Sequence, residues 1–501
     1  MMKLWEKYAA SFRKNASKTA FCIDSQFYTY LEFSEYISGS QRALLNFSCL
    51  EKGVPVGVIC RDSIETFAAI FAIWFSGHPF VPLNPLHPDP FNLEKIKLAG
   101  IQVLFETESK QDSKDWPVPV LNHKHLKSDE PLSIIQKQHR AYILYTSGST
   151  GKPKGVPISP DAINAFIEGF LEIYPDLTSD DRFLQTYDLT SDAAFTGYLV
   201  PLLLGASVYT IPSGGIKYLS IVKLLQERQI TWTQFTPSVL NYLRPYLRKI
   251  HFNALKHSHF GGEALPLDLV SEWAECVPNA EISNIYGPTE TTITCTIHRT
   301  EINDLSEKVH NGVISIGKPL KDVKILILDD NNQIVAQGEK GELCIGGIQV
   351  MEGYLADSGN ENSIFFRPDE NGNLERYYRS GDLVFEDEQG FLFFCGRKDE
   401  QLKISGYRIE PAEIEMAISR VTNGIKSKAF GFRNKGRTES MVVFLEANDI
   451  SSESLKDNLR AILPAPLIPE KIICIDQFPL NSNGKIDKTR LFESHSKLIY
   501  D

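Results

Sequence analysis

Residues 141–155 read Ala-Tyr-Ile-Leu-Tyr-Thr-Ser-Gly-Ser-Thr-Gly-Lys-Pro-Lys-Gly. The apolar beginning of this segment predicts a β-strand, and the glycines that follow it allow backbone N–H groups to turn toward one point. Hydroxyl groups supply further hydrogen-bond donors and the lysines supply positive charge, so the segment has the chemistry of a polyphosphate-binding loop. The candidate phosphate-binding residues are Thr146, Ser147, Gly148, Ser149, Thr150, Gly151, Lys152 and Lys154.

The loop differs from a Walker loop, in which four residues separate the first glycine from a Gly-Lys pair that Ser or Thr follows. Here two residues separate Gly148 from Gly151, and Pro153 follows Lys152. A stretch rich in Ser and Gly is more often a flexible surface turn than a binding loop. The interpretation therefore depends on the rest of the chain.

The composition is that of a large globular protein. The chain has 501 residues, of which 42% are apolar and 23% charged, and it is too long for a single hydrophobic core. Its 52 basic and 63 acidic side chains give a net charge of −11, so we expect neither nucleic acid nor a membrane surface as a partner. The absence of a signal peptide and of any run of about 20 apolar residues predicts a cytoplasmic protein.

The order of patterns along the chain predicts an α/β fold. From about residue 55 to residue 350, short apolar runs that suit β-strands alternate with helical patterns. From Val323 the pattern changes to hairpins, which predicts a β-rich subdomain. The end of the chain predicts a small α+β unit, in which one helix begins at Pro411 and a second extends from Ser452 to Leu463.

Residues 145–156 resemble the signature loop of the adenylate-forming superfamily, and the resemblance extends over almost the whole chain. The sub-pattern is similar to the amino-acid adenylation domains of peptide synthetases, and especially to stand-alone D-alanine–carrier-protein ligases. The closer likeness lies in Gln-Phe-Thr-Pro-Ser at 234–238 and Phe-Gly-Gly-Glu-Ala-Leu-Pro at 260–266. The other motifs follow in family order: Asn-Ile-Tyr-Gly-Pro-Thr-Glu-Thr-Thr at 284–292, Gly-Glu-Leu-Cys-Ile-Gly-Gly at 341–347, Tyr-Arg-Ser-Gly-Asp-Leu at 378–383, Gly-Arg-Lys-Asp-Glu-Gln-Leu-Lys-Ile-Ser-Gly-Tyr-Arg-Ile-Glu at 396–410 and Asn-Gly-Lys-Ile-Asp at 483–487.

The resemblance implies that a carboxylate attacks the α-phosphate of ATP, that pyrophosphate leaves, and that a thiol then takes the acyl group from AMP. The nucleophile is already an anion, so the site must supply in-line positioning and charge neutralisation by Mg²⁺ and a lysine. ATP and Mg²⁺ are therefore the expected cofactors. By resemblance, Lys485 bridges the carboxylate and the phosphate, Glu290 holds Mg²⁺, and Thr289 contacts the α-phosphate.

The resemblance also implies the contacts to the nucleoside. Tyr286 would lie against the adenine, and Asp382 would accept hydrogen bonds from the ribose hydroxyls with Arg397 beside it. Each of these residues has a plainer structural interpretation when it stands alone, such as a turn or a local ion pair. The remaining residues predicted to bind the nucleotide are Gly262, Glu263, Asn284 and Gly287.

Adenylation and thiol transfer need different faces of a small C-terminal domain in this family, so a few backbone torsions must absorb a large rotation. Asp399 matches the position of this hinge, and Lys403 lies in the segment that faces the site for thiol transfer. The expected domains are a core at 1–397, which binds ATP and the acyl substrate, and a mobile lid at 398–501, which carries Lys485.

An amino-acid-selecting member of the family places an Asp against the substrate ammonium. Asp188 and Asp192 are both candidates; the register favours Asp192, although Ser191 stands before it where an aromatic residue is usual. Gly261 replaces a bulkier residue of the D-alanine ligases, so we expect a larger pocket and no strict specificity for D-alanine. The predicted lining consists of Asp192, Ala193, Thr196, Gln234, His259, Gly261, Ile285, Ile293 and Thr294. For His259, two interpretations stay open: a contact to the substrate, or a purely structural role.

The sequence thus predicts an enzyme that activates an amino acid and loads it onto the phosphopantetheine thiol of a carrier protein. A separate carrier protein is expected because the chain contains no carrier-domain motif. One alternative is an acyl- or aryl-CoA ligase of the same superfamily, which would not need the Asp that binds ammonium. The other is a nucleotide-binding protein without catalytic activity.

Overall fold

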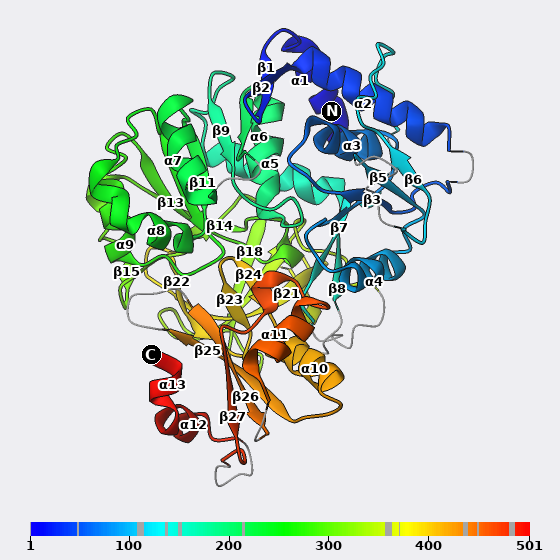
Figure 1. The fold of residues 1–501 in the computed structure, drawn as a ribbon. Helices are drawn as coiled ribbons and strands as arrows, with labels where there is room; N and C mark the ends of the chain where they lie inside the picture. Colours follow the sequence, from blue (N-terminus) through cyan, green and yellow to red (C-terminus); the bar gives the residue numbers. More distant parts are fainter. Residues whose placement is uncertain are drawn as a thin grey trace. The chain divides into compact units, whose positions relative to one another are not determined.

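The computed structural model describes residues 2–47, 50–107, 115–135, 139–148, 153–212, 216–355, 363–369, 371–433, 439–447, 450–479 and 486–500 (Figure 1). The chain divides into two compact units. The first contains Met1–Pro85, Lys95–Tyr145 and Gly155–Lys398, and the second contains Leu86–Glu94, Thr146–Lys154 and Asp399–Asp501.

Within the described residues, the largest sheet of the first unit has nine strands, and its central strands are parallel. These strands are short and almost entirely buried, as expected when helices cover both faces of a parallel sheet. The carboxyl ends of such strands form the edge at which α/β proteins bind ligands. The order across the sheet is β17 (Lys318–Pro319), β14 (Thr296–Thr300), β13 (Glu281–Tyr286), β12 (His257–Gly261), β11 (Trp232–Phe235), β9 (Arg182–Gln185), β10 (Ser207–Thr210), β1 (Thr19–Ile23) and β2 (Gln26–Thr29).

A second sheet has the order β6 (Val120–Asn122), β5 (Val103–Glu106), β3 (Val56–Ile59), β4 (Phe80–Leu83), β7 (Tyr142–Thr146) and β8 (Lys154–Ile158). The phosphate-loop segment therefore begins on a strand, as predicted, and leads into a second strand. Helix α3 (Ile64–Phe75) is buried at every position, because its residues are apolar on all sides. Ser63 caps this helix by accepting a hydrogen bond from the amide of Thr66. The alternation of strands and helices confirms the predicted α/β class.

The β-rich subdomain is an antiparallel sheet of β18 (Val323–Leu328), β19 (Gly341–Gly347), β20 (Ile364–Pro368), β21 (Leu374–Glu386) and β22 (Leu392–Arg397). It confirms the change to hairpins that the sequence predicts from Val323. The other helices and strands that are described in this part of the chain are α1 (Leu4–Lys14), α2 (Tyr30–Leu45), α4 (Asp89–Ala99), α5 (Pro160–Ile173), α6 (Ala193–Leu204), α7 (Lys217–Glu227), α8 (Pro237–Leu243), α9 (Leu267–Ala274), β15 (Val309–His310) and β16 (Val313–Ile314).

The second unit is of the α+β type. Helix α10 (Pro411–Val421) begins at Pro411, whose fixed φ and missing N–H suit the first turn of a helix. Helix α11 (Ser452–Arg460) ends earlier than predicted, and the amide of Ile462 makes the tighter i→i−3 hydrogen bond that is common at helix ends, to the carbonyl of Leu459. The other elements are β23 (Leu402–Ile404), β24 (Tyr407–Ile409), β25 (Ser427–Arg433), β26 (Glu439–Glu446), β27 (Lys471–Ile475), α12 (Lys488–Ser494) and α13 (Ser496–Tyr500).

None of the helices built from described residues combines the length and the apolar character of a membrane span.

Candidate active site

The predicted acyl pocket begins where three neighbouring strands of the large sheet end. Gln234 on β11 pairs with His259 on β12, and Gly261 at the end of β12 pairs with Ile285 on β13. Side chains alternate across a sheet, so residues two apart on a strand share a face. The fold thus brings these predicted lining residues onto one face of the sheet, where all of them are buried.

Asp192 precedes helix α6 without capping it. Its backbone is already helical, with φ −64° and ψ −28°, and its side chain makes no capping hydrogen bond. The carboxyl group is buried, and its Oδ2 has no hydrogen-bond partner among the residues that the structure describes. Burial raises the pKa of Asp192 to about 7; a hydrogen bond from Thr289 opposes this shift and the charge of Glu290 adds to it. A cation beside Asp192 would restore its ionised form.

Asp188 has a different environment. Its Oδ1 accepts hydrogen bonds from the amide of Thr190 at 2.8 Å and from the Thr190 hydroxyl at 2.7 Å. Its Oδ2 accepts a hydrogen bond from the side-chain amide of Asn84. Hydrogen bonds from other residues of the protein therefore occupy both carboxylate oxygens of Asp188. The bonds from Thr190 close the turn before α6.

The space beside Gly261 is filled by a neighbouring strand. A Cβ at position 261 would lie 2.6 Å from Cγ1 of Ile285 and 3.0 Å from the Ile285 carbonyl oxygen, both far inside van der Waals contact. Ile285 therefore occupies the space directly beside Gly261, and the expectation of a larger pocket stays a prediction. The missing side chain makes room for Ile285, another of the predicted lining residues.

Glu290 lies in the turn that follows β13 and is completely buried. Its Oε1 accepts a hydrogen bond of 2.7 Å from the hydroxyl of Tyr354, and its backbone carbonyl accepts one of 2.9 Å from the amide of Met351. Two and three residues further on, Thr292 and Ile293 have φ of 61° and 69°, a left-handed conformation that is strained for β-branched side chains. The surrounding structure must hold this loop in place.

The side chain of Gln349 holds the loop that follows Glu290 in place. No sequence pattern indicated this residue. Its Nε2 donates to the carbonyls of Thr291 at 3.2 Å, Thr292 at 3.2 Å and Thr294 at 2.9 Å. Its own carbonyl accepts a hydrogen bond of 2.6 Å from the Thr292 hydroxyl. The sequence offers only a long polar residue two positions after the glycine-rich end of β19, and this pattern is too weak to identify a role.

Asp382 on β21 is 1% exposed and lies within a hydrogen-bond network. The hydroxyl of Tyr286 donates to Oδ2 of Asp382 at 2.6 Å, and Arg397 on the paired strand β22 donates to Oδ1. A further hydrogen bond runs from the amide of Asp382 to the hydroxyl of Ser380. Burial and the charge of Asp382 raise the pKa of Tyr286 well above its usual range, so the phenol remains a donor.

Three other predicted nucleotide-binding residues have structural contacts. The side-chain amide of Asn284 donates to the carbonyls of Ile314 and Ser315, both at 3.0 Å. Glu263 accepts a hydrogen bond of 3.0 Å from the amide of Ser238 in the first turn of α8. A Cβ on Gly287 would lie 2.5 Å from the carbonyl oxygen of Ile293, so this glycine allows the Glu290 loop to return close to β13. Beside Glu263, Gly262 has φ of 83°, which favours glycine.

A family model described as AMP-binding enzyme matches residues 8–355. The chain belongs to this family of AMP-binding enzymes. The match confirms the resemblance to adenylate-forming enzymes.

Among curated relatives, this AMP-binding enzyme is 29% identical to zwittermicin A synthase ZmaJ of Bacillus cereus, over 97% of the chain and 94% of ZmaJ. It is 31% identical to tyrocidine synthase 3 of Brevibacillus parabrevis over 95% of the chain. It is also 30% identical to gramicidin S synthase 2 of Brevibacillus brevis over 97% of the chain. The chain spans 7% of the tyrocidine synthase and 11% of the gramicidin S synthase.

Three solved structures share the fold. Holo-PA1221, an NRPS protein with adenylation and PCP domains, superposes with a TM-score of 0.84 and 25% identity, over 98% of this chain and 84% of that one. The Vibrio cholerae adenylation domain AlmE, in complex with glycyl-adenosine-5'-phosphate, has a TM-score of 0.85 and 24% identity, over 99% and 98%. The o-succinylbenzoate CoA synthetase MenE of Bacillus subtilis has a TM-score of 0.84 and 21% identity, over 98% of both chains.

Other predicted site residues of this AMP-binding enzyme lie in the second unit. The hydroxyl of Ser147 donates to the carbonyl of Arg408 at 2.8 Å, and Asp399 accepts a hydrogen bond of 3.2 Å from the amide of Gln401. Lys403 on β23 pairs with Arg408 on β24, and Lys154 is buried at the start of β8. Thr146 ends β7, and Gly148 is a buried residue of the loop that follows. Ser149, Thr150, Gly151, Lys152 and Lys485 lie outside the described residues.

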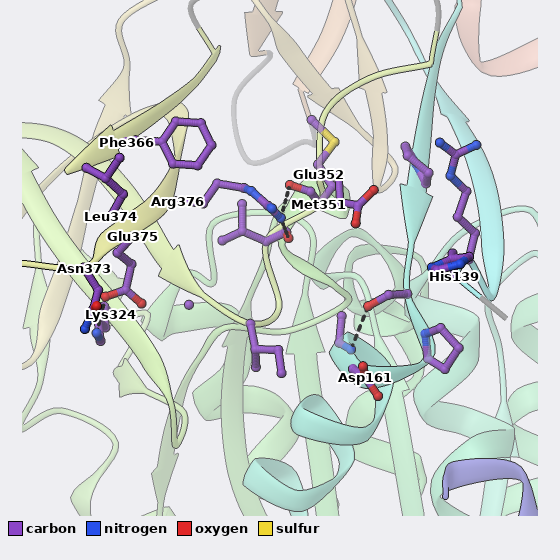
Figure 2. A pocket seen from close by; sticks show the side chains of 18 of the residues that line it. His139, Asp161, Lys324, Met351, Glu352, Phe366, Asn373, Leu374, Glu375 and Arg376 are labelled. Atoms are coloured by element: carbon purple, nitrogen blue, oxygen red, sulfur yellow. Dashed lines mark hydrogen bonds and ion pairs between the residues drawn. The ribbon is translucent and has the colours of Figure 1, made fainter. Parts of the chain in front are cut away.

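A cavity of about 540 Å³ opens beside the β-rich subdomain. Its wall includes Val350, Met351 and Glu352, and none of the described residues that line it was predicted as a site residue (Figure 2). Figure 2 shows Arg376 directed at the backbone of this segment, where it donates to the carbonyls of Val350 and Met351, both at 3.2 Å. The segment that carries Gln349 is therefore held both by Arg376 and by hydrogen bonds with the Glu290 loop.

Proposed function

We propose that this AMP-binding enzyme activates an amino acid as its aminoacyl adenylate and transfers it to the phosphopantetheine thiol of a separate carrier protein. The observation that carries the proposal is the buried Asp192, whose Oδ2 has no hydrogen-bond partner in the described part of the chain. A substrate ammonium would supply the missing partner and a compensating charge. The sequence similarity to ZmaJ and the likeness to holo-PA1221 support this interpretation.

The first reaction joins the amino acid to ATP. An oxygen of the substrate carboxylate attacks the α-phosphorus; the new O–P bond forms as the bond to the β-phosphate oxygen breaks, and pyrophosphate leaves with that electron pair. With its ammonium on Asp192, the substrate would lie beside Thr289 and Glu290. The hydrogen bond of Thr289 and the charge of Glu290 both affect the pKa of Asp192. Thr289 would orient the α-phosphate, and Lys485 would bridge it to the attacking carboxylate.

Glu290 would hold Mg²⁺, an ion that prefers carboxylate oxygens and takes only one or two of them from the protein. The donor set fits this expectation, because the buried Glu290 carboxylate is oriented by Tyr354. When bound, the ion supplies positive charge that neutralises the phosphates. The loop residues from Thr146 to Lys154 are proposed to hold the phosphates.

Asp382 is proposed to accept hydrogen bonds from the ribose hydroxyls. Arg397 already orients its carboxylate, and the hydroxyl of Tyr286 occupies Oδ2. Ribose binding therefore requires the Tyr286 hydroxyl to leave Oδ2 or to share it. Such a movement is compatible with the predicted contact between the Tyr286 ring and the adenine.

In the second reaction the carrier thiol attacks the acyl carbonyl. A C–S bond forms, the C–O bond to AMP breaks, and the thiol proton passes to solvent. We propose that residues 398–501 form the mobile lid for the two reactions, with Asp399 as the hinge and Lys403 facing the site during thiol transfer. Asp399→Pro should then suppress transfer to the thiol while pyrophosphate exchange continues; equal loss of both would contradict the hinge.

The alternative is an acyl- or aryl-CoA ligase, and the likeness to MenE shows that the fold serves such enzymes. Asp192 favours an amino-acid substrate, because a plain carboxylic acid brings no cation. The test is pyrophosphate exchange in Asp192→Asn, with Asp188→Asn as the matched control. Loss of a buried charge pair predicts a rise of at least about 30-fold in the KM for the amino acid in Asp192→Asn. Because Asp188 bonds within the protein, its variant should change this KM much less; equal effects would contradict the assignment.

A further inference from the structure

Several side chains on the pocket face of the large sheet are buried and incompletely hydrogen-bonded. Each is at most 3% exposed, whereas most buried polar atoms in folded proteins have a hydrogen-bond partner. These atoms have no partner among the described residues: Nε2 of Gln185, Oγ1 of Thr196, Oε1 of Gln234, and Nδ1 and Nε2 of His259. The hydroxyl of Tyr187 lies beside Gln234, and a side-chain hydrogen bond with Gln234 lowers the pKa of this phenol against the larger rise that burial causes.

The register of the strands places these groups side by side. Gln234 pairs with His259, and the parallel pairing of β11 with β9, in which Thr233 lies opposite Leu184, sets Gln185 next to Gln234. Helix α6 crosses this row: a Cβ on Gly197 would lie 2.7 Å from Oε1 of Gln185. Thr196, the residue before Gly197, is on the same helix. The side chains of Gln185, Gln234 and His259 thus form one polar row, and helix α6, which carries Thr196, lies against Gln185.

Apolar groups bound the row. The ring of Trp232 stacks on Phe183 at 4.7 Å, and the ring of His259 lies 4.9 Å from Trp232 and 4.9 Å from Tyr174. At the other end, Ile285 fills the space beside Gly261. The row is therefore a polar patch of limited length between apolar and aromatic side chains.

The row carries no net charge of its own. Burial lowers the pKa of His259 well below its usual range, so the imidazole is neutral. The ionisable groups that act on it are His257 and Arg299, and Arg299 is paired with Glu281 and Asp176. A charged substrate side chain would therefore enter this row without a counter-ion, which is strongly unfavourable.

We propose that the amino acid selected by this site has an uncharged, hydrogen-bonding side chain, of the carboxamide or hydroxyl class. Such a side chain offers a donor to Gln234 and an acceptor to Gln185, and it needs no counter-ion. This inference rests on the proposed function, since it assumes that Asp192 holds the ammonium of the same substrate.

The test is amino-acid-dependent pyrophosphate exchange by the unmodified protein with side chains matched in size. Asparagine is compared with leucine and aspartate, glutamine with methionine and glutamate, and threonine with valine. A site that hydrogen-bonds its substrate rejects the apolar isostere strongly, so we expect kcat/KM for the best uncharged polar member to exceed that of its partners by at least about 100-fold. Preference for an apolar or a charged member would overturn the inference and leave the proposed function intact. Exchange with no amino acid at all would instead count against the proposed function.

A substitution of Gln234 tests whether this residue determines the preference for a polar side chain. Gln234→Leu should reduce the preference for the polar member of its pair at least tenfold while exchange with the apolar member continues. Gln226→Leu makes the same chemical change at an exposed position of α7 and should keep the preference. An unaltered preference in soluble Gln234→Leu would contradict the inference; if that variant does not fold, the substrate panel on the unmodified protein still decides.

Discussion

The hydroxyl of Tyr354 donates a hydrogen bond of 2.7 Å to Oε1 of Glu290. These residues come from the segment after β19 and from the turn after β13, and the amide of Met351 donates to the Glu290 carbonyl to reinforce the contact. Both the side chain and the backbone of the proposed Mg²⁺ ligand are therefore oriented by one segment, residues 347–355. The proposed metal site depends on that segment as much as on the motif that contains Glu290.

Tyr354→Phe removes this hydrogen bond without changing the shape of the ring. Hydrogen bonds to charged groups contribute roughly 1.5–3 kcal/mol, so we expect the Mg²⁺ concentration for half-maximal pyrophosphate exchange to rise about tenfold. Tyr246→Phe, at an exposed position, is the control. An unchanged Mg²⁺ dependence in Tyr354→Phe would show that Tyr354 does not orient a metal ligand.

Gln349 should matter for both halves of the site, because its carbonyl partners extend from the Glu290 turn to the acyl pocket. Gln349→Leu removes its side-chain donors to three carbonyls, and a loss of about 1 kcal/mol for each hydrogen bond predicts a lower free energy of unfolding by roughly 2–4 kcal/mol. We expect KM to rise for both ATP and the amino acid in pyrophosphate exchange. A rise for only one substrate would contradict the view that Gln349 joins the two sites.

Sequence patterns predicted well those helices and strands that are determined by residues close together in the chain. The helix that begins at Pro411 follows from a proline at its first turn. The hairpin of β18 and β19 follows from strands separated by turn residues. These features depend on neighbours in the chain.

The site was predictable only in part, because its geometry depends on residues far apart in the sequence. Gln349 is 55–58 positions from its carbonyl partners, and no local pattern signals such a contact. The filling of the space at Gly261 by Ile285 depends on the pairing of β12 with β13. The contrast between Asp188 and Asp192 likewise emerges only when Asn84 is brought to Asp188 from another part of the chain.

Gly261 and Ile285 should behave as a coupled pair. Gly261→Ala places a Cβ 2.6 Å from Cγ1 of Ile285, and overpacking of this kind costs about 1–3 kcal/mol in the free energy of unfolding. Ile285→Ala removes that atom, so the double variant should lose less stability than the sum of the single variants. Denaturant titration of the three variants measures the coupling; strict additivity would mean that the side chains do not compete for this space.

The pH dependence of substrate binding follows from Asp192. Its pKa is raised to about 7 by burial, so in the free enzyme the carboxyl group loses its charge as the pH falls through 7. The neutral form cannot pair with an ammonium group, and kcat/KM for the amino acid should fall about tenfold per pH unit below this point. In the complex the ammonium favours the ionised form, so kcat should decline only at lower pH. Asp192→Asn should lack this acidic limb, and a kcat/KM independent of pH between 6 and 8 in the unmodified enzyme would contradict the assignment.

The most direct test of the account compares an amino acid with the carboxylic acid that differs from it only by lacking the amino group. In pyrophosphate exchange with the unmodified enzyme, the ammonium contact to buried Asp192 predicts a kcat/KM at least about 30-fold higher for the amino acid. In Asp192→Asn this advantage should largely disappear. If the unmodified enzyme uses the acid without an amino group as well as the amino acid, Asp192 does not bind a substrate ammonium and the amino-acid assignment is wrong.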